Sequence, residues 1–355
     1  MERDQWACFC MCRERRFAPP GHRVSRAEMD YLIAARRERP GDDPIFALNA
    51  EARRRHAAGE DVINATIGAL LYDDGSLATM SSVVEALRSN PPAEAAAYAP
   101  IAGRADFRQA VIDDILGEHG LADQAISVAT PGGSGALRLA LDNFLEPNQS
   151  VLTTSFYWGP YRTLADESGH RLHTYNMFDA NKRFDVDALD RALGEGVKRD
   201  GRVMLFLNTP CHNPTGYSMD AAEWADTIAV IERHAKAAPI TVLTDIAYGY
   251  YAPEALRSCV HSCSQLVGKA LVLFAWSASK SFAQYGLRVG ALIALVDSDQ
   301  QRERIFNALS YSCRGTWSNC NSGGQAAITR VLNEPILNAR SIQERAKLVG
   351  MLNRR

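Results

Sequence analysis

The chain has 355 residues, of which 46% are hydrophobic and 23% charged, and its formal charge at pH 7 is -2. This composition is ordinary for a globular, water-soluble enzyme, and the chain is long enough for two domains. A nearly neutral chain has no general attraction for nucleic acid or anionic membranes. No apolar run reaches the about 20 residues that span a bilayer, and the N-terminus lacks the apolar segment of a secretory signal. We therefore expect a cytoplasmic protein without nucleic-acid or membrane partners.

The eight cysteines show no pairing pattern and no metal-binding pattern. Those of "CFCMC" (8–12) have C-x-C-x-C spacing, whereas zinc ribbons use C-x2-C pairs. We interpret residues 1–30 as a disordered leader. Cys259 and Cys263 would share one face of a helix while His261 points elsewhere, which favours an ordinary helix over a ligand set. We therefore expect no metal.

Six apolar runs alternate with amphipathic stretches such as 135–145 and 221–238, which we predict to be helices. The runs predict short buried strands at 124–130, 149–155, 202–208, 240–245, 270–276 and 289–296. Continuous apolar strands separated by helices indicate an α/β fold of three layers, with helices on both faces of a mostly parallel sheet. In such sheets ligands bind beyond the carboxyl ends of the strands.

Polar groups follow several of these predicted strands. "PGGSGALR" follows the first, and its backbone N–H groups at Gly133 and Ser134 would open a helix and could bind a phosphate, although such a turn alone is a weak signal. Asp245 ends "ITVLTD", where a buried carboxylate requires a protonated partner; a helix cap or a structural ion pair is the alternative. Asn213 of "TPCHNPTGY" lies either in a surface turn or in a ligand-binding turn.

The segment "AWSASKSFAQYGLRVG" (275–290) carries two cations, Lys280 and Arg288. A lysine that follows a buried strand has its pKa lowered by desolvation and by nearby positive charge, which makes its amine a nucleophile suited to Schiff-base formation. Arg288 supplies such a charge and can hold a phosphate through two parallel hydrogen bonds. One cation would therefore make a covalent link and the other would bind an anion.

In this order the motifs resemble those of fold-type I pyridoxal-phosphate enzymes, and most closely class I aminotransferases of the aspartate and aromatic amino-acid group. The resemblance covers roughly residues 45–355. It implies a large cofactor-binding domain like that of aspartate aminotransferase at 76–340, preceded at 31–75 by an N-terminal arm and part of the small domain. It also implies a homodimer with active sites at the subunit interface.

The resemblance assigns the cofactor, pyridoxal 5'-phosphate, to named residues. Lys280 would form the Schiff base and carry the proton, Asp245 would pair with the pyridinium nitrogen, and Tyr248 with Asn213 would bind the phenolic oxygen. It assigns the phosphate to Gly133, Ser134, Ser277, Arg288 and, from the neighbouring subunit, Tyr98. Trp158 of "SFYWGPY" would stack on the ring, although an aromatic residue near a strand end is more often part of the core.

The substrate would contact Gly68, Trp158, Asn213 and Arg314. In the resemblance Gly68 of "NATIGALL" lies near the substrate carboxylate, where the missing side chain permits close approach. Arg314 of "CRGTWSN" would bind the distal carboxylate of a dicarboxylic substrate across the dimer. An isolated arginine is otherwise an ordinary surface charge.

The sequence departs from the family pattern in two places. Gly132 replaces a serine that is frequent in the aspartate group, which we expect to cost at most one hydrogen bond. The family pattern also continues beyond "SIQERAKLVGMLNRR", and the continuation carries the arginine for the substrate's α-carboxylate. We therefore expect 341–355 to begin a helix that leads to an absent part of the small domain. Its apolar positions fall on one helical face: Ile342, Ala346, Val349 and Leu352.

The expected activity is transamination from an amino acid, aspartate or an aromatic one, to a 2-oxo acid such as 2-oxoglutarate. Lyases and decarboxylases on the same fold keep the same cofactor residues and remain an alternative. A truncated cofactor-binding protein with little activity is a third interpretation.

Overall fold

The computed structural model describes residues 31–39, 41, 44–64, 66 and 68–355, and the chain divides into two compact units, 1–68 and 69–355. The cysteines of 8–12 and the predicted leader lie outside the described residues. In the first unit a 3-10 helix η2 (Ala34–Arg36) precedes the helix α1 (Pro44–Ala57). The domain boundaries expected from the sequence stay predictions.

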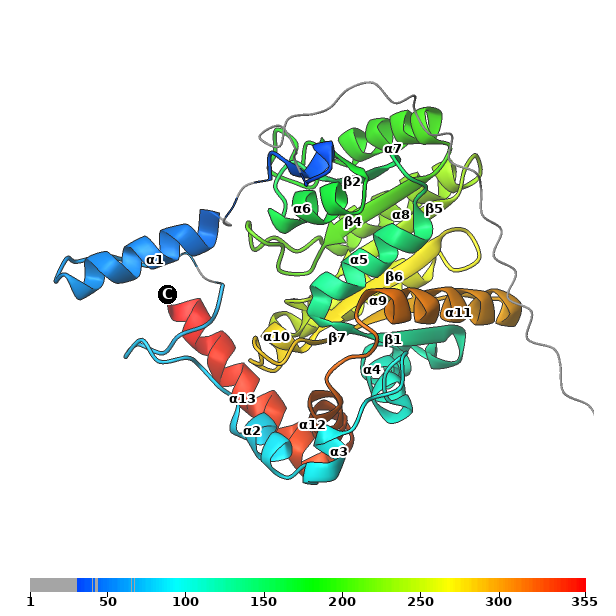
Figure 1. The fold of residues 1–355 in the computed structure, drawn as a ribbon. Helices are drawn as coiled ribbons and strands as arrows, with labels where there is room; N and C mark the ends of the chain where they lie inside the picture. The colour runs from blue at the N-terminus through cyan, green and yellow to red at the C-terminus, as the bar shows by residue number, and fades with distance from the viewer. Residues whose placement is uncertain (1–30, 40, 42–43, 65, 67) are drawn as a thin grey trace, which may run out of the picture. The chain divides into compact units, whose positions relative to one another are not determined.

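A seven-stranded sheet forms the centre of the second unit, with strand order β1-β7-β6-β5-β4-β2-β3 (Figure 1). Strand β7 runs antiparallel to both of its neighbours, and the remaining adjacent pairs are parallel. The strands are β1 (Ala125–Pro131), β2 (Ser150–Thr154), β3 (Arg171–Tyr175), β4 (Val203–Asn208), β5 (Ile240–Asp245), β6 (Leu271–Ser277) and β7 (Val289–Leu295). The mostly parallel sheet is confirmed, and β3 is a strand that the sequence analysis missed.

The predicted helices at 135–145 and 221–238 correspond to α5 and α8. The helices of this unit are α2 (Ser81–Arg88), α3 (Pro92–Ala96), α4 (Ala105–Leu116), α5 (Gly132–Phe144), α6 (Pro160–Glu167), α7 (Val186–Asp200), α8 (Ala221–Ala235), α9 (Pro253–Ser264), α10 (Ala278–Ser281), α11 (Asp299–Thr316), α12 (Ser322–Asn333) and α13 (Pro335–Arg354). Short 3-10 helices are η3 (Gly117–His119), η4 (Ala122–Gln124) and η5 (Gly249–Tyr251). None of the helices in the described part of the chain is long and apolar enough to cross a membrane.

Two hydrophobic clusters cover the two faces of the sheet. One cluster joins inward-facing strand residues to α5, α6 and α11, for example through Leu137 and Leu309. The other joins the opposite strand residues to helices that include α4, α7, α8 and α9, for example through Phe107 and Trp224. Because alternate residues of a strand point to opposite faces, each strand contributes to both clusters. The three-layer α/β architecture expected from the sequence is therefore confirmed.

Helix α9 has the face predicted for it. Cys259 and Cys263 are both fully buried in the core, whereas His261 is exposed. The two thiols therefore pack as small apolar groups.

Helix α13 turns a different face to the core from the one expected. Of the predicted apolar face, Ile342, Ala346 and Leu352 are exposed and Val349 is half-buried. The buried residues of this helix are Leu337, Ser341, Arg345, Leu348 and Met351. Arg345 is buried because its Nε donates to the Ser281 carbonyl at 2.8 Å and its guanidinium covers the rings of Tyr250 and Phe282.

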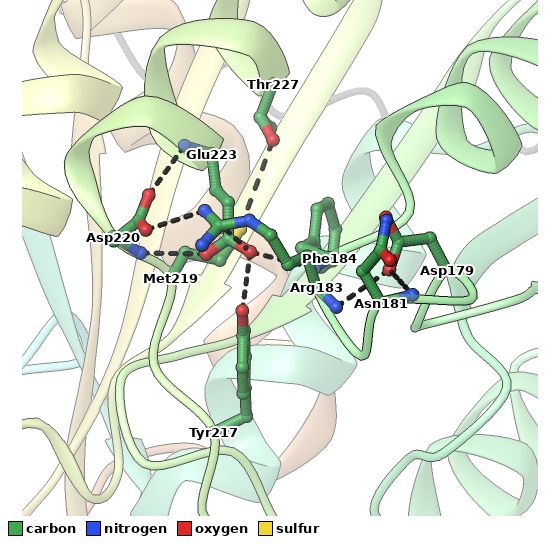
Figure 2. Close-up of polar contacts among 9 residues, drawn as sticks. All are labelled: Asp179, Asn181, Arg183, Phe184, Tyr217, Met219, Asp220, Glu223 and Thr227. Atoms are coloured by element: carbon green, nitrogen blue, oxygen red, sulfur yellow. Dashed lines mark hydrogen bonds and ion pairs between the residues drawn. The ribbon is translucent and has the colours of Figure 1, made fainter.

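A buried carboxylate, Glu223, ties the start of α8 to two neighbouring loops (Figure 2). Its side chain accepts hydrogen bonds from the Tyr217 hydroxyl at 2.5 Å, the Phe184 N–H at 2.8 Å and the Asp220 N–H at 2.9 Å. Asp220 in return caps the helix by accepting from the Glu223 N–H, so the two residues form a capping box. Arg183 lies 3.3 Å from the same carboxylate. Tyr217 follows the Asn-Pro-Thr-Gly turn, so this cluster anchors one end of a loop that borders the candidate site.

Candidate active site

The candidate site lies at one edge of the sheet, where several strands end or begin. Strands β4, β5 and β6 run in the same direction, so Asn208, Asp245 and Ser277 reach the same edge, and Asn208 pairs directly with Asp245. Strand β7 runs the other way, so it starts at this edge with Val289, and Arg288 immediately precedes it. The one reversed central strand therefore brings an arginine to the carboxyl ends of its parallel neighbours.

Asp245 is a buried acid, with 6% of its surface exposed. Its Oδ2 accepts a hydrogen bond from the Tyr161 hydroxyl at 2.7 Å, and its Oδ1 accepts from the Ala247 N–H at 3.2 Å. Burial raises the pKa of the Asp245 carboxyl, and these hydrogen bonds oppose that effect. Within the part of the chain that the structure describes, no cationic side chain forms an ion pair with Asp245. The carboxylate can therefore be stabilised further by a positively charged group.

Lys280 lies in α10, a single helical turn that directly follows β6. Ser277 caps this turn, because its hydroxyl accepts from the Ser279 N–H at 3.2 Å. The Lys280 carbonyl accepts a hydrogen bond from the Tyr251 hydroxyl at 3.1 Å. The backbone around the lysine is thus fixed on both sides, which restricts where its amine can reach.

The surroundings of the Lys280 amine favour its neutral form. Burial, and then the positive charge of Arg288, lower the pKa of Lys280 to about 8. Its Nζ lies 4.7 Å from the ring centre of Tyr285 and 5.6 Å from that of Tyr248. A free lysine has a pKa of about 10.4, so the nucleophilic neutral fraction at neutral pH is far larger here.

The glycine-rich turn between β1 and α5 forms another wall of the site. Helix α5 begins at Gly132, so the N–H groups of Gly133 and Ser134 lie in its first turn, where backbone donors have no partner inside the helix. A Cβ atom added to Gly133 would lie 3.5 Å from the Ser277 Cβ, so Ser277 borders this turn. The arrangement suits an anion, because helix N-termini combine free donors with a partial positive charge.

Arg288 connects this turn to the lysine segment. Its Nη1 donates to the Ser279 Oγ and to the Tyr285 carbonyl, both at 3.0 Å, and its Nη2 donates to the Pro131 carbonyl at 3.3 Å. Arg288 adopts a left-handed backbone with φ 53°. For a non-glycine residue this conformation costs on the order of 1–3 kcal/mol and is concentrated at functional sites.

Gly132 has a local reason to lack a side chain. Its φ is +72°, and an added Cβ would lie 2.2 Å from the Arg288 Nη2. A Cβ added to Gly290 would lie 2.4 Å from the Gly132 carbonyl carbon, so the turn and the start of β7 touch through their backbones. We expected glycine in place of serine at position 132 to cost at most one hydrogen bond. The missing side chain is instead needed, because it lets the Arg288 guanidinium lie close to Gly132.

Asn213 and Tyr248 also lie near Asp245. The Asn213 N–H donates to the Asn208 Oδ1 at 2.5 Å, which joins the Asn-Pro-Thr-Gly turn to the end of β4. Burial, followed by the nearby Asp245 charge, raises the pKa of Tyr248 to about 12, and a hydrogen bond with the Asn213 side chain opposes the shift. Tyr248 therefore keeps its proton at neutral pH and can donate a hydrogen bond.

The remaining predicted site residues have few contacts with the residues described above. The Trp158 ring is half-buried and packs edge-on against Tyr161 with 5.8 Å between ring centres. Tyr98 is 91% exposed, and Arg314 is exposed at the end of α11, where its Nη1 donates to the Ser318 Oγ at 2.6 Å. Gly68 ends the first unit, 1–68. Their roles stay predictions.

Three residues of the site were missed from the sequence. Asn208 links Asp245 to Asn213 and is the last residue of a predicted strand, so the rule on strand ends could have found it. Tyr285 lies between Lys280 and Arg288 in the connection from β6 to β7. No signal in the sequence indicated the contact of Tyr161 with Asp245.

A family model, "Aminotransferase class I and II", matches residues 60–354. The chain belongs to this family. It is 30% identical over 320 residues to an aromatic-amino-acid aminotransferase of Paracoccus denitrificans, covering 88% of this chain and 78% of the relative. It is 28% identical over 315 residues to an aspartate aminotransferase of Pseudomonas aeruginosa, covering 85% of this chain and 75% of the relative.

Solved structures agree with this assignment. An aminotransferase of Anaerococcus prevotii matches with a TM-score of 0.86 and 31% identity, covering 92% of this chain and 81% of the other. An aromatic-amino-acid aminotransferase of Burkholderia pseudomallei, covalently bound to pyridoxal phosphate, matches with a TM-score of 0.76 and 27% identity, covering 91% and 80%. The aminotransferase family of this chain uses pyridoxal phosphate as its cofactor.

The residues at the sheet edge fit that cofactor. Lys280 offers an amine that is largely neutral above pH 8, as a link to an aldehyde requires. Asp245 is a buried acid that forms no ion pair with a cation among the described residues, so a protonated ring nitrogen could serve as its charged partner. The first turn of α5, with Arg288 drawn close by the missing Cβ of Gly132, suits a phosphate.

Proposed function

We propose that this aminotransferase moves an amino group from aspartate or an aromatic amino acid to a 2-oxo acid such as 2-oxoglutarate, with Lys280 as the residue that carries the cofactor. The observation that supports this assignment is the meeting of a low-pKa lysine, a buried acid and an anion-binding turn at one edge of the sheet. The two relatives named for aspartate and for aromatic amino acids support the choice of substrates.

When bound, pyridoxal phosphate supplies an electron sink for the electrons released at the substrate's Cα. Lys280 Nζ would bind the cofactor's aldehyde carbon and, once released, move the proton at Cα. Asp245 would hold a proton on the ring nitrogen, and Tyr248 with Asn213 would donate to the phenolic oxygen. The phosphate would be held by Gly133, Ser134, Ser277 and Arg288. Trp158 would exclude water from one face of the ring.

We also propose that Tyr98 and Arg314 act in the site of a second subunit, and that Gly68 and Arg314 contact the substrate. The high exposure of Tyr98 and Arg314 supports this proposal, because neither side chain is held in the core of its own chain. A homodimer would place such residues against a neighbouring site. Arg314 would then select substrates that carry a distal carboxylate.

Covalent trapping tests the role of Lys280. After borohydride reduction and dialysis, the wild-type protein should keep the cofactor on the peptide that contains Lys280, and Lys280→Ala should lose it. Lys269→Ala, which removes a half-exposed lysine outside the site, is the matched control. Only the neutral Lys280 amine reacts with the cofactor's aldehyde. The rate at which the protein binds added cofactor covalently should therefore rise with pH and level off near the Lys280 pKa of about 8. Reduced cofactor on another lysine would contradict the assignment.

Substrate selectivity tests the role of Arg314. Arg314→Ala should weaken the binding of aspartate, glutamate and 2-oxoglutarate by about 1.5–3 kcal/mol, because only dicarboxylates lose a charge-assisted hydrogen bond to this residue. Aromatic donors should be much less affected. Single-turnover rates across a panel of donors measure both effects, and Arg304→Ala, on an exposed position of the same helix, is the control. An equal loss for all donors would refute a role in selectivity.

A further inference from the structure

The hydroxyl of Tyr161 forms a direct hydrogen bond with the Asp245 carboxylate. Tyr161 is the second residue of α6 and is fully buried, and its hydroxyl donates to the Asp245 Oδ2 at 2.7 Å. Burial, followed by the nearby Asp245 charge, raises the pKa of Tyr161 well above its ordinary value. The phenol therefore keeps its proton throughout the physiological range and always acts as the donor in this pair.

The phenol is the main group that favours the ionised form of Asp245 inside the protein. Among the hydrogen bonds that lower the pKa of Asp245, the one from Tyr161 has the largest effect, ahead of those from the Ala247 N–H and the Asn208 amide. Tyr248 is another titratable group near this carboxyl, and burial keeps it neutral. A buried carboxyl without such donors would take up a proton and could no longer accept one from a ligand.

The ring of Tyr161 is fixed by its neighbours. It packs edge-on against Trp158, at 5.8 Å and an interplanar angle of 90°, and against Phe206, at 5.2 Å and 74°. The Tyr161 N–H also donates to the Trp158 carbonyl at 2.9 Å. The same residue therefore holds the candidate partner of the ring nitrogen and the candidate ring-stacking tryptophan in a fixed relation.

We propose that Tyr161 is a positioning residue for transamination, whose hydroxyl keeps the Asp245 carboxylate ionised and aimed at the cofactor's ring nitrogen. This inference rests on the proposed role of Asp245 and deepens it. Tyr161 acts through Asp245 and does not itself touch the reacting atoms.

Tyr161→Phe tests the proposal, because it removes the hydroxyl and keeps the ring. In the cofactor-free protein, infrared difference spectroscopy should show the Asp245 carboxyl titrating at higher pH than in wild type. The Asp245 band is identified by its absence in Asp245→Asn. In the loaded enzyme kcat should fall roughly 10- to 100-fold, the size expected for a lost hydrogen bond to a charged group, with a smaller change in KM.

Tyr175→Phe is the matched control. Tyr175 is also a buried tyrosine in this unit, and its hydroxyl has no hydrogen-bond partner among the described residues. Removing that hydroxyl should leave both the Asp245 titration and kcat unchanged. A similar loss of kcat in Tyr175→Phe would overturn the proposal.

A double-mutant cycle separates positioning from a general structural effect. In an Asp245→Asn background, Tyr161→Phe should change turnover less than about twofold, because the group it acts on is gone. An unchanged Asp245 titration in Tyr161→Phe, or the full loss of kcat in the double variant, would overturn the proposal. Normal turnover in Asp245→Asn alone would instead overturn the proposed role of Asp245, while the infrared titration still decides whether the phenol holds the carboxylate.

Discussion

Glu223 and Asp245 are two buried carboxyl groups of the same unit, with 4% and 6% of their surfaces exposed. Glu223 accepts three hydrogen bonds, from Tyr217, Phe184 and Asp220, and has a guanidinium 3.3 Å away (Figure 2). Asp245 accepts from Tyr161, Ala247 and the Asn208 amide, and no cation among the described residues forms an ion pair with it. The Glu223 carboxylate already has a cationic partner within the protein, whereas the Asp245 carboxylate can still accept a positively charged partner.

Their positions in the fold explain this difference. Glu223 lies in the first turn of α8, where free N–H groups and the helix dipole stabilise an anion. Asp245 ends a parallel strand at the sheet edge where ligands bind, and burial raises its pKa. A buried acid that lacks a paired cation is therefore a better indicator of a functional site than burial alone.

The largest effect should come from Asp245→Asn. Transamination should fall by several orders of magnitude, because no anion then keeps the ring nitrogen protonated. The cofactor-free variant should be at least as stable as wild type near neutral pH. Burial raises the folded-state pKa of Asp245, so the wild-type protein loses stability as the pH rises through that pKa. The stability advantage of Asp245→Asn over wild type should therefore vanish in acid. Single-turnover rates and urea unfolding at several pH values measure both effects.

Near-normal turnover in Asp245→Asn would remove the functional side of the contrast with Glu223. A clear loss of stability at neutral pH would show that contacts within the protein stabilise the Asp245 carboxylate as well as they stabilise that of Glu223.

A smaller effect, on stability, should come from Glu223→Gln. The free energy of unfolding should fall by about 1.5–3 kcal/mol, because charge-assisted hydrogen bonds are lost and a buried amide faces donors. Turnover per folded molecule should stay near the wild-type value. Urea unfolding, with rates normalised to the folded fraction, measures the two effects.

The matched control for Glu223 is Arg183→Gln. It removes a half-exposed cation but leaves the neutral donors, so it should cost less than about 1 kcal/mol. A loss of turnover in Glu223→Gln as large as that in Asp245→Asn would end the distinction between the two carboxylates.

The sequence predicted much of this arrangement because polar residues at strand ends follow a simple rule. Asp245, Lys280 and Arg288 each lie beside a strongly apolar run, and parallel strands bring such ends together. The predicted sheet failed only at β3, where "RLHTY" has no continuous apolar run and lies at the sheet edge. Only Leu172 and Tyr175 of this strand are buried, so its hydrophobic signal is weak.

Other features depend on contacts that no local pattern reveals. Helix α13 buries Arg345 and Ser341 and exposes Ile342, because a carbonyl and two aromatic rings satisfy the buried guanidinium. An apolar-face rule therefore selects the wrong side of this helix. Tyr161 is similar, since its role depends on a carboxylate 84 positions away in the chain.

The reversed direction of β7 has a consequence for how the candidate site can be lost. Lys280 and Arg288 both lie in the connection between β6 and β7, and both ends of that connection are strands of the central sheet. The Arg288 guanidinium bonds back to Ser279, which adjoins the lysine. Local unfolding of this connection would displace both cations in a single event, so covalent capture and phosphate binding would form one cooperative unit.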